Sequence, residues 1–248
     1  MDDLTSRIFP PGGAFTFRLC REERTDRAAM ATIPAGDFEA LQEQGAAEPS
    51  LGEEERLFLR RGLAPRRRRS FLLGRIAARQ ALRLLGVTPC AERGIGFGVF
   101  GQPVVYGGGG YSVSITHSDA LAAAVAFPVG HPLAIDVEST QADNLEVAQT
   151  VQTPEERELV KNTARGDAAR ERLVTFALWS AREALSKVLG CGFMCSGQLL
   201  AVQTLEADAA GTWHGEFRHV GQWAFEIVAG GGHVLALVRP KRTLLQWD

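Results

Sequence analysis

Two long segments of similar sequence lie far apart in this chain of 248 residues. The first, FLLGRIAARQALRLLG, covers residues 71–86, and the second, VTFALWSAREALSKVLG, covers residues 174–190. They share the motif ARQAL or AREAL, at residues 78–82 and 181–185. Apolar residues recur at helical spacing in both segments, which predicts two long helices.

Two further matches occur in the same order around these segments. They are EER at 54–56 and 155–157, and the apolar stretches VSITHSDALAAAVAF at 113–127 and FEIVAGGGHVLALV at 225–238. Because the order of the matches is preserved, the sequence predicts two similar halves, residues 1–130 and 131–248, packed as a pseudo-dimer. Each half is expected to contain a strand, an acidic helix, a long helix and several antiparallel strands, which is an α+β fold.

The segment Thr153-Pro154-Glu155-Glu156 has the sequence of a helix start. Threonine at the cap, proline at the first helical position and glutamate at the third form a capping box. The two glutamates therefore have a structural role and need no catalytic one.

Composition and charge exclude several classes of protein. An apolar fraction of 45% and a charged fraction of 23% are those of a globular protein with a full core. The net charge of -2 argues against general nucleic-acid binding. The longest apolar run, residues 120–127, is too short to span a bilayer, and the first residues, MDDLTSRIFPPGG, lack the pattern of a signal peptide. We therefore expect a cytoplasmic protein.

The four cysteines are expected to be free thiols of a reducing compartment. They are Cys20, Cys90, Cys191 and Cys195. Only the last two are close in sequence, and no histidine follows them at the spacing of a zinc finger. No zinc site is predicted.

The stretch PLAIDVE at residues 132–138 begins as a buried strand and ends with two acids. Because alternate residues of a strand point to the same face, Asp136 and Glu138 are expected to project together. Two neighbouring negative charges at the end of an apolar strand repel each other. We therefore expect a positively charged partner to offset this repulsion.

A third acid lies on the second long helix. Glu183 and Lys187 are four residues apart and share a face, which begins with Trp179, a large ring that should be buried. Gln80 takes the place of Glu183 in the first long helix, so the helical scaffold does not require the acid. The pair is either a surface ion pair or part of a functional site.

Asp136, Glu138 and Glu183 would together form a negatively charged, oxygen-rich pocket. Hard divalent cations prefer such ligands, and Mg²⁺ fills its other positions with water and substrate phosphates. The alternative is a solvated acidic strand end that holds no ion.

Basic residues are concentrated before and along the first long helix. Four consecutive arginines occupy residues 66–69, and Arg68, Arg75 and Arg79 fall on one helical stripe. Such a stripe suits a ligand with several phosphates, although most arginine runs are solvated faces. The stretch SITHS at 114–118 adds hydroxyl groups and an imidazole at the end of an expected strand. A site using both the acidic and the basic groups would lie in the cleft between the halves.

Four short stretches of the chain, three of them described above, together match a known pattern. They are GQP (101–103), SITHS (114–118), AIDVE (134–138) and WSAREALSK (179–187). This set resembles the 4′-phosphopantetheinyl transferases, in which a D-x-E strand is followed by a helix with the pattern W/F-S/C-x-K-E-x-x-x-K. The likeness is to the larger, single-chain, pseudo-dimeric type. FLLGRIAARQAL further resembles the branch that serves enterobactin-like siderophore synthesis, or other secondary metabolism.

The resemblance implies an activity and its components. Family members use Mg²⁺, with Mn²⁺ as an alternative ion, to transfer the 4′-phosphopantetheine arm of coenzyme A. The acceptor is a serine of an apo acyl, peptidyl or aryl carrier protein, and adenosine 3′,5′-bisphosphate is released. By this resemblance the N-terminal half would bind the coenzyme A nucleotide, and the C-terminal half would hold the carboxylates.

The resemblance also implies roles for individual residues. The metal ligands would be Asp136, Glu138 and Glu183, and the catalytic residues Glu183, Lys187 and Asp136. Residues that contact coenzyme A would be Arg68, Arg75, Arg79, Thr116, His117, Asp136 and Lys187.

Three positions depart from the family pattern. Ala134 replaces a glycine, Arg182 replaces the lysine before Glu183, and Gln102 replaces a lysine of the surfactin-type branch. Arginines 66–69 would then supply the phosphate contact that Gln102 does not make. Two alternative functions are a coenzyme A-binding module without catalysis and a metal-dependent phosphohydrolase that uses water as the nucleophile.

Overall fold

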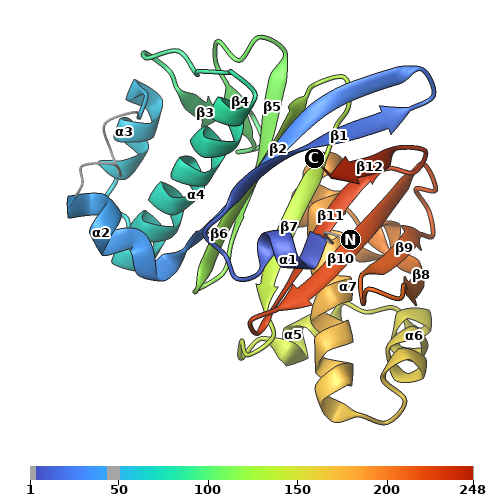
Figure 1. Ribbon diagram of the computed structural model, residues 1–248. Coiled ribbons are helices and arrows are strands. Elements are labelled where there is room, and N and C mark those ends of the chain that lie inside the picture. Colours follow the sequence, from blue (N-terminus) through green and yellow to red (C-terminus); the bar gives the residue numbers. More distant parts are fainter. Residues whose placement is uncertain (1–3, 44–50, 248) are drawn as a thin grey trace. The chain divides into compact units, whose positions relative to one another are not determined.

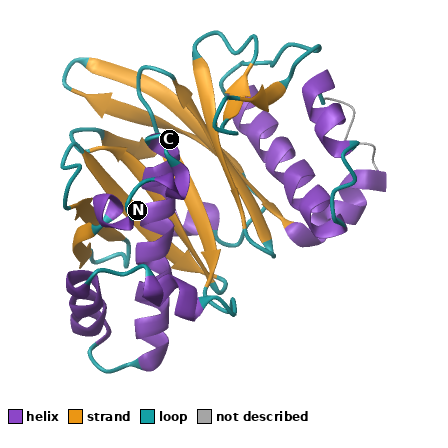
Figure 2. Cartoon of the chain, turned by 180° about the vertical axis from the view of Figure 1, so that it is seen from behind, coloured by secondary structure: helices purple, strands orange, loops and turns teal. Residues whose placement is uncertain are grey.

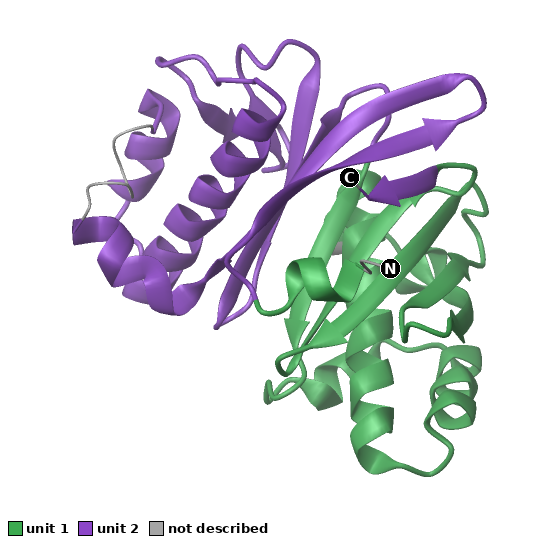
Figure 3. Cartoon of the chain, viewed as in Figure 1, with its two compact units in different colours: residues 1–10, 133–243 green, residues 11–132, 244–248 purple. Residues whose placement is uncertain are grey.

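The computed structural model describes residues 4–43 and 51–247. Two compact units divide the chain (Figure 3). Unit 1 contains residues 1–10 and 133–243, and unit 2 contains residues 11–132 and 244–248. The division near residue 132 lies close to the expected one, but each terminal segment belongs to the unit formed by the other half of the chain. The terminal segments contain none of the repeated motifs, so the sequence could not show to which unit they belong.

Unit 1 contains a five-stranded antiparallel sheet and several helices (Figure 1). Its helices are α1 (Leu4–Ile8), α5 (Leu145–Thr150), α6 (Pro154–Ala164) and α7 (Ala168–Val188), with 3-10 turns at Gly192–Met194 and Gly197–Leu200. Its strands are β7 (Ala134–Ser139), β8 (Val202–Ala207), β9 (Trp213–Phe217), β10 (Trp223–Gly230) and β11 (His233–Pro240). The strand order is β7-β11-β10-β9-β8, and α7 packs on β7 and β11.

Unit 2 contains a second five-stranded antiparallel sheet and a two-stranded one. Its helices are α2 (Phe38–Glu43), α3 (Glu53–Leu59) and α4 (Pro65–Leu84), after a 3-10 turn at Ala35–Asp37. Its strands are β1 (Ala14–Arg21), β2 (Arg24–Pro34), β3 (Ile95–Phe97), β4 (Pro103–Val105), β5 (Tyr111–His117), β6 (Leu121–Pro128) and β12 (Leu244–Trp247). The strand order is β12-β1-β2-β6-β5, and α4 packs on β2, β5 and β6.

The two units repeat one topology, which confirms the predicted α+β fold in two similar halves. In each, a strand leads into an acidic helix and a long helix, and antiparallel strands follow. The last of these strands pairs with the first: β11 with β7 in unit 1, and β6 with β2 in unit 2. The long helix of each unit lies against its sheet, as Figures 1 and 2 show.

The two long helices end in the same way. Gly86 follows α4 and Gly190 follows α7, and both have positive φ, which glycine adopts without steric cost. In each case the next residue donates its N–H to a carbonyl near the last helical turn, from Val87 to Leu82 and from Cys191 to Ser186. This arrangement satisfies carbonyl groups that the helix leaves open.

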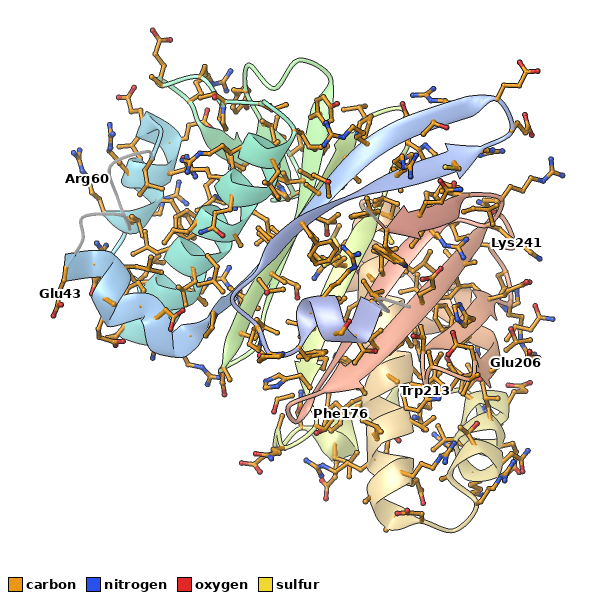
Figure 4. The ribbon with its side chains drawn as sticks, viewed as in Figure 1. Glu43, Arg60, Phe176, Glu206, Trp213 and Lys241 are labelled. Carbon is orange, nitrogen blue, oxygen red and sulfur yellow. The ribbon has the colours of Figure 1, made fainter. Side chains whose placement is uncertain are left out.

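Each unit has its own hydrophobic core. In unit 1 one face of α7 is buried against the sheet, together with residues such as Phe176 and Trp213, which Figure 4 labels. In unit 2 the corresponding face of α4 packs on alanine-rich strands β2 and β6. Small side chains on these strands allow a long helix to approach the sheet closely. Among the described residues, no helix is both long and apolar enough to cross a membrane.

Candidate metal and catalytic centre

The acids predicted from PLAIDVE lie on β7, which is the edge strand of the sheet in unit 1. Asp136 pairs with Ala236 of β11 and Glu138 with Val234, so both side chains project from the same face. Helix α7 covers this face, and the hydroxyl of Ser180 donates to the backbone carbonyl of Asp136 over 2.8 Å. This hydrogen bond holds the strand against the helix at the point where the acids emerge.

Helix α7 adds the third acid. Asp136, Glu138 and Glu183 each offer a carboxylate oxygen, and these three atoms lie within 4.8 Å of one another. Asp136 is buried, while Glu138 and Glu183 are partly exposed. The structure thus brings together the three acids that the sequence selected, from a strand and a helix that are distant in the chain.

Two further residues of α7 contact these acids. The indole N–H of Trp179 donates to Glu138 over 3.0 Å. The Lys187 ammonium donates to Asp136 over 2.7 Å and to the Ile135 carbonyl over 3.1 Å. Residues 179, 183 and 187 therefore lie on one stripe of α7 beside the acids, and Lys187 is bound to Asp136 rather than to Glu183. The sequence predicted a buried ring at Trp179, but the ring is only partly buried, and its role as a hydrogen-bond donor could not be read from the sequence.

The surroundings raise the pKa of two of the acids. Burial, followed by the charges of Asp136 and Glu183, raises the pKa of Glu138 to about 8, although Trp179 and Lys187 oppose this. Burial and the charge of Asp136 raise the pKa of Glu183 to about 7, against the opposing effect of Lys187. The single positive charge of Lys187 therefore does not balance the negative charge of the three carboxylates.

This donor set fits a hard divalent cation. Carboxylate oxygens are the ligands that Mg²⁺ prefers, and three of them leave coordination positions for water and phosphate oxygens. A bound cation would also favour the ionised forms of Glu138 and Glu183, whose pKa values are raised in the metal-free protein.

Unit 2 lacks the corresponding acids. Strands β6 and β11 both end at a proline, and the residue four positions before it is Ala124 in β6 and Ala236 in β11. Ala236 pairs with Asp136, whereas Ala124 pairs with Ala31. By the same register Ile33 corresponds to Glu138, and the ARQAL motif places Gln80 opposite Glu183. The repeated scaffold therefore carries the acidic cluster in unit 1 alone among the described residues.

Two family models match the chain. One, described as the 4′-phosphopantetheinyl transferase superfamily, matches residues 132–238. The other, the 4′-phosphopantetheinyl transferase N-terminal domain, matches residues 53–127. Together they account for most of the chain, and each covers one copy of the repeat. This chain belongs to the 4′-phosphopantetheinyl transferase superfamily. A comparison with curated protein sequences gives no significant match.

The enzyme is a 4′-phosphopantetheinyl transferase, and coenzyme A is the donor substrate of this family. The acidic cluster and Lys187 of the transferase fall within residues 132–238, which the superfamily model matches. The four arginines at residues 66–69, called the basic cluster below, and the SITHS stretch fall within the N-terminal domain match. The predicted family and enzyme class are thereby confirmed.

The basic cluster of unit 2 lies beside the end of β5. Arg67 Nη1 and His117 Nε2 are 3.4 Å apart, and Arg66 forms an ion pair with Asp119. His117 is exposed, whereas Thr116, the residue before it, is buried. Residues from the start of α4 and the end of β5, which sequence analysis grouped only by their chemistry, are therefore neighbours in the structure.

Two of the predicted phosphate contacts have a structural partner in the transferase. Arg75 and Arg79 form ion pairs with Glu55 of α3, at 3.0 Å for Arg75, and all three side chains are buried. Burial lowers the pKa of Arg75 to about 10. These ion pairs hold α4 against α3, and contact of Arg75 and Arg79 with coenzyme A phosphates stays a prediction.

Unit 1 repeats this pairing. Glu156, at the third position of α6, accepts from Arg182 of α7 over 3.0 Å, and both side chains are buried. Glu156 also completes the capping box with Thr153, as the sequence predicted. The residues of these pairs belong to the EER and AR motifs, which recur in both halves of the sequence. Only the structure shows that the glutamate of one motif pairs with the arginine of the other.

Proposed function

We propose that this transferase is Mg²⁺-dependent and moves the 4′-phosphopantetheine arm of coenzyme A to a serine of an apo carrier protein. The convergence of three carboxylates within 4.8 Å carries this proposal. Asp136, Glu138 and Glu183 would hold the ion, and Mn²⁺ is an alternative with similar preferences. The products are the holo carrier protein and adenosine 3′,5′-bisphosphate.

The reaction forms one bond and breaks one. The carrier serine oxygen attacks the β-phosphorus of coenzyme A, the serine loses its proton, and the bond to adenosine 3′,5′-bisphosphate breaks. When bound, the divalent cation supplies positive charge to the pyrophosphate oxygens. No nucleophile of the transferase is required, because the carrier protein provides it.

The residues of α7 have separate roles in this proposal. Lys187 bonds to Asp136, which fixes that carboxylate and places an ammonium beside the cluster, where it opposes negative charge that builds on the leaving group. Trp179 orients Glu138 through its N–H. Glu183, the helix-borne acid of the cluster, assists removal of the serine proton, either directly or through a water.

We assign binding of the coenzyme A nucleotide to residues of unit 2. Arg68, Thr116 and His117 stay predicted contacts, and the proximity of His117 to Arg67 supports a phosphate-binding role for this region. Asp136 and Lys187 are the predicted contacts of unit 1. Arg75 and Arg79 also stay predicted contacts, and their ion pairs with Glu55 fix both side chains beside α3.

The carrier protein is proposed from the sequence alone. The FLLGRIAARQAL stretch supports a role in siderophore or other secondary-metabolite synthesis, with acyl, peptidyl or aryl carrier domains as acceptors. The cytoplasmic location expected from the sequence stays a prediction.

Mass spectrometry of apo carrier proteins tests the proposal. Incubation with the transferase, coenzyme A and Mg²⁺ should add the phosphopantetheine mass to one serine, and chelation should abolish the addition. Asp136→Asn and Glu183→Gln, which keep side-chain size, should slow transfer by about 10²–10³-fold. Glu155→Gln, an exposed acid on the neighbouring helix, is the matched control and should retain wild-type transfer.

Two results would contradict the proposal. Wild-type transfer by either variant would remove the acids from the mechanism, and transfer in excess chelator would remove the metal. Cleavage of coenzyme A without any carrier protein would instead indicate a phosphohydrolase, so a reaction without carrier is included.

A further inference from the structure

A pair of thiols lies directly after α7. The sulfur atoms of Cys191 and Cys195 are 3.3 Å apart, and both residues are partly exposed. All four cysteines of the chain are free thiols, as the sequence predicted. Neither Cys191 nor Cys195 belongs to the acidic cluster or to the basic cluster, so the proposed transfer gives this pair no role.

The backbone of the segment CGFMC brings the two thiols together. Residues Gly192–Met194 form a 3-10 turn, and the N–H of Met194 donates to the Cys191 carbonyl over 3.2 Å. Gly192 has a φ of 53°, which glycine adopts without steric cost. The turn therefore returns Cys195 to Cys191, and the contact between the thiols is built into the local fold.

Both ends of this segment are held by α7. The N–H of Cys191 donates to the Ser186 carbonyl over 3.1 Å, and the Arg182 guanidinium donates to the Gly197 carbonyl over 2.6 Å. Arg182 is itself buried and paired with Glu156, which fixes the second anchor. Because the segment is restrained in this way, little conformational freedom is lost when its two thiols are joined.

The two sulfur atoms have different surroundings. Cys191 Sγ donates to the Ser186 carbonyl over 3.7 Å, and burial, followed by the neighbouring Cys195 sulfur, raises the pKa of the Cys191 thiol to about 11. Cys195 Sγ contacts the carbonyl of Gly192, an exposed residue, over 3.7 Å. A thiol that stays protonated can donate to the neighbouring sulfur and so favour a thiolate there. This difference makes Cys195 the attacking sulfur and Cys191 the resolving one.

We propose that Cys191 and Cys195 form a reversible disulfide by exchange with a low-molecular-weight disulfide such as oxidised glutathione. The Cys195 thiolate attacks one sulfur of the oxidant, whose S–S bond breaks, and the first small thiol leaves with the proton that Cys195 lost. Cys191 then loses its proton and attacks the Cys195 sulfur of the mixed disulfide, which releases the second small thiol. Two protein thiols are thereby oxidised, and one small disulfide is reduced to two thiols. In a reducing compartment the pair returns to the dithiol.

Peptide mapping of the full chain tests the proposal. The protein is incubated with oxidised glutathione, the remaining thiols are alkylated, and trypsin releases residues 188–218, which contain Cys191 and Cys195 and no other cysteine. This peptide should carry neither an alkyl group nor glutathione and should have lost two hydrogen atoms. Reduction with dithiothreitol before alkylation should restore two alkylated cysteines. A disulfide oxidant is used because Met194 is 77% exposed and peroxide would oxidise it.

Three serine variants separate the two steps of the exchange. Cys191→Ser removes the resolving sulfur and should accumulate glutathione on Cys195, at a level at least about tenfold above that of the wild type. Cys195→Ser leaves only the thiol with the raised pKa, which should react at least about tenfold more slowly. Cys20→Ser, in β1, is the matched control and should form the same disulfide as the wild type. Circular dichroism reports whether each variant is folded.

Several outcomes would overturn the proposal. These are alkylation of both Cys191 and Cys195 where Cys20 and Cys90 carry glutathione, glutathione on both cysteines of the wild-type peptide, and a disulfide that links residues 188–218 to a different peptide. Equal amounts of glutathione on Cys195 in the wild type and in Cys191→Ser would also overturn it, because Cys191 would then not act as the resolving thiol.

Discussion

Glu138 and Glu183 are the residues whose ionisation the proposed cation would change most. In the metal-free transferase their pKa values are raised to about 8 and about 7. The folded protein therefore binds more protons than the unfolded chain above the ordinary glutamate pKa, and its stability falls as pH rises toward about 8. The proposed divalent cation would bind the ionised forms and release these protons.

This linkage predicts a pH-dependent effect of Mg²⁺ on stability. Without metal, the melting temperature should decrease between about pH 5 and about pH 8, and saturating Mg²⁺ should raise it more at about pH 8 than at about pH 6. Differential scanning calorimetry with and without chelator measures both effects. A Mg²⁺-induced shift that is largest at the lower pH would contradict the assignment of these two glutamates.

Trp179 provides a second test at the scale of single residues. Trp179→Phe keeps an aromatic ring but removes the N–H that donates to Glu138. We expect Mg²⁺ affinity to fall by about 10–100-fold, because groups that orient metal ligands contribute at this level. Isothermal titration calorimetry measures the change. Trp223→Phe, in β10, is the matched control, and equal loss in both variants would indicate general destabilisation.

At the scale of elements, each unit fixes its long helix with a buried glutamate–arginine pair. Glu55 joins α3 to α4, and Glu156 joins α6 to α7. In unit 1, Arg182 also donates to the carbonyls of Val151 and Gly197, so one guanidinium holds several segments against α7. This pair positions the helix that carries Trp179, Glu183 and Lys187.

Loss of this pair should destabilise unit 1. Arg182→Met leaves Glu156 buried without its counter-charge, which we expect to lower the free energy of unfolding by about 3–5 kcal/mol. Urea denaturation measures the change. Arg218→Met removes an exposed partner of Glu155 and should leave stability close to that of the wild type. Similar losses in the two variants would contradict a special role for the buried pair.

At the scale of the whole molecule, one scaffold occurs twice but carries the acids once. Unit 2 has Ala31, Ile33 and Gln80 where unit 1 has Asp136, Glu138 and Glu183. The basic cluster and His117 instead distinguish unit 2. The two copies of the scaffold therefore carry different residues at equivalent positions.

This asymmetry predicts a single high-affinity cation site. Titration with Mn²⁺, followed by electron paramagnetic resonance, should give one tight site per chain, which Asp136→Asn removes. Gln80→Glu should not create a second site, because Ala31 and Ile33 remain apolar. Two tight sites in the wild type would contradict this reading of the repeat.

The sequence by itself determined features that depend on local periodicity and short motifs. The two long helices, the capping box at Thr153 and the order of elements follow from residue spacing and helix-end chemistry. The repeat predicted two similar halves, and the alternation of Asp136 and Glu138 on one strand placed both on one face. These inferences need no knowledge of distant contacts.

Only the tertiary structure decided which distant groups meet. It paired Arg75 and Arg79 with Glu55, although their spacing alone fitted a phosphate-binding stripe equally well. It also directed the Trp179 N–H to Glu138 and Lys187 to Asp136. The physical reason is that burial and partner choice depend on how helices and strands pack, and a helical stripe has the same sequence pattern whichever surface it faces.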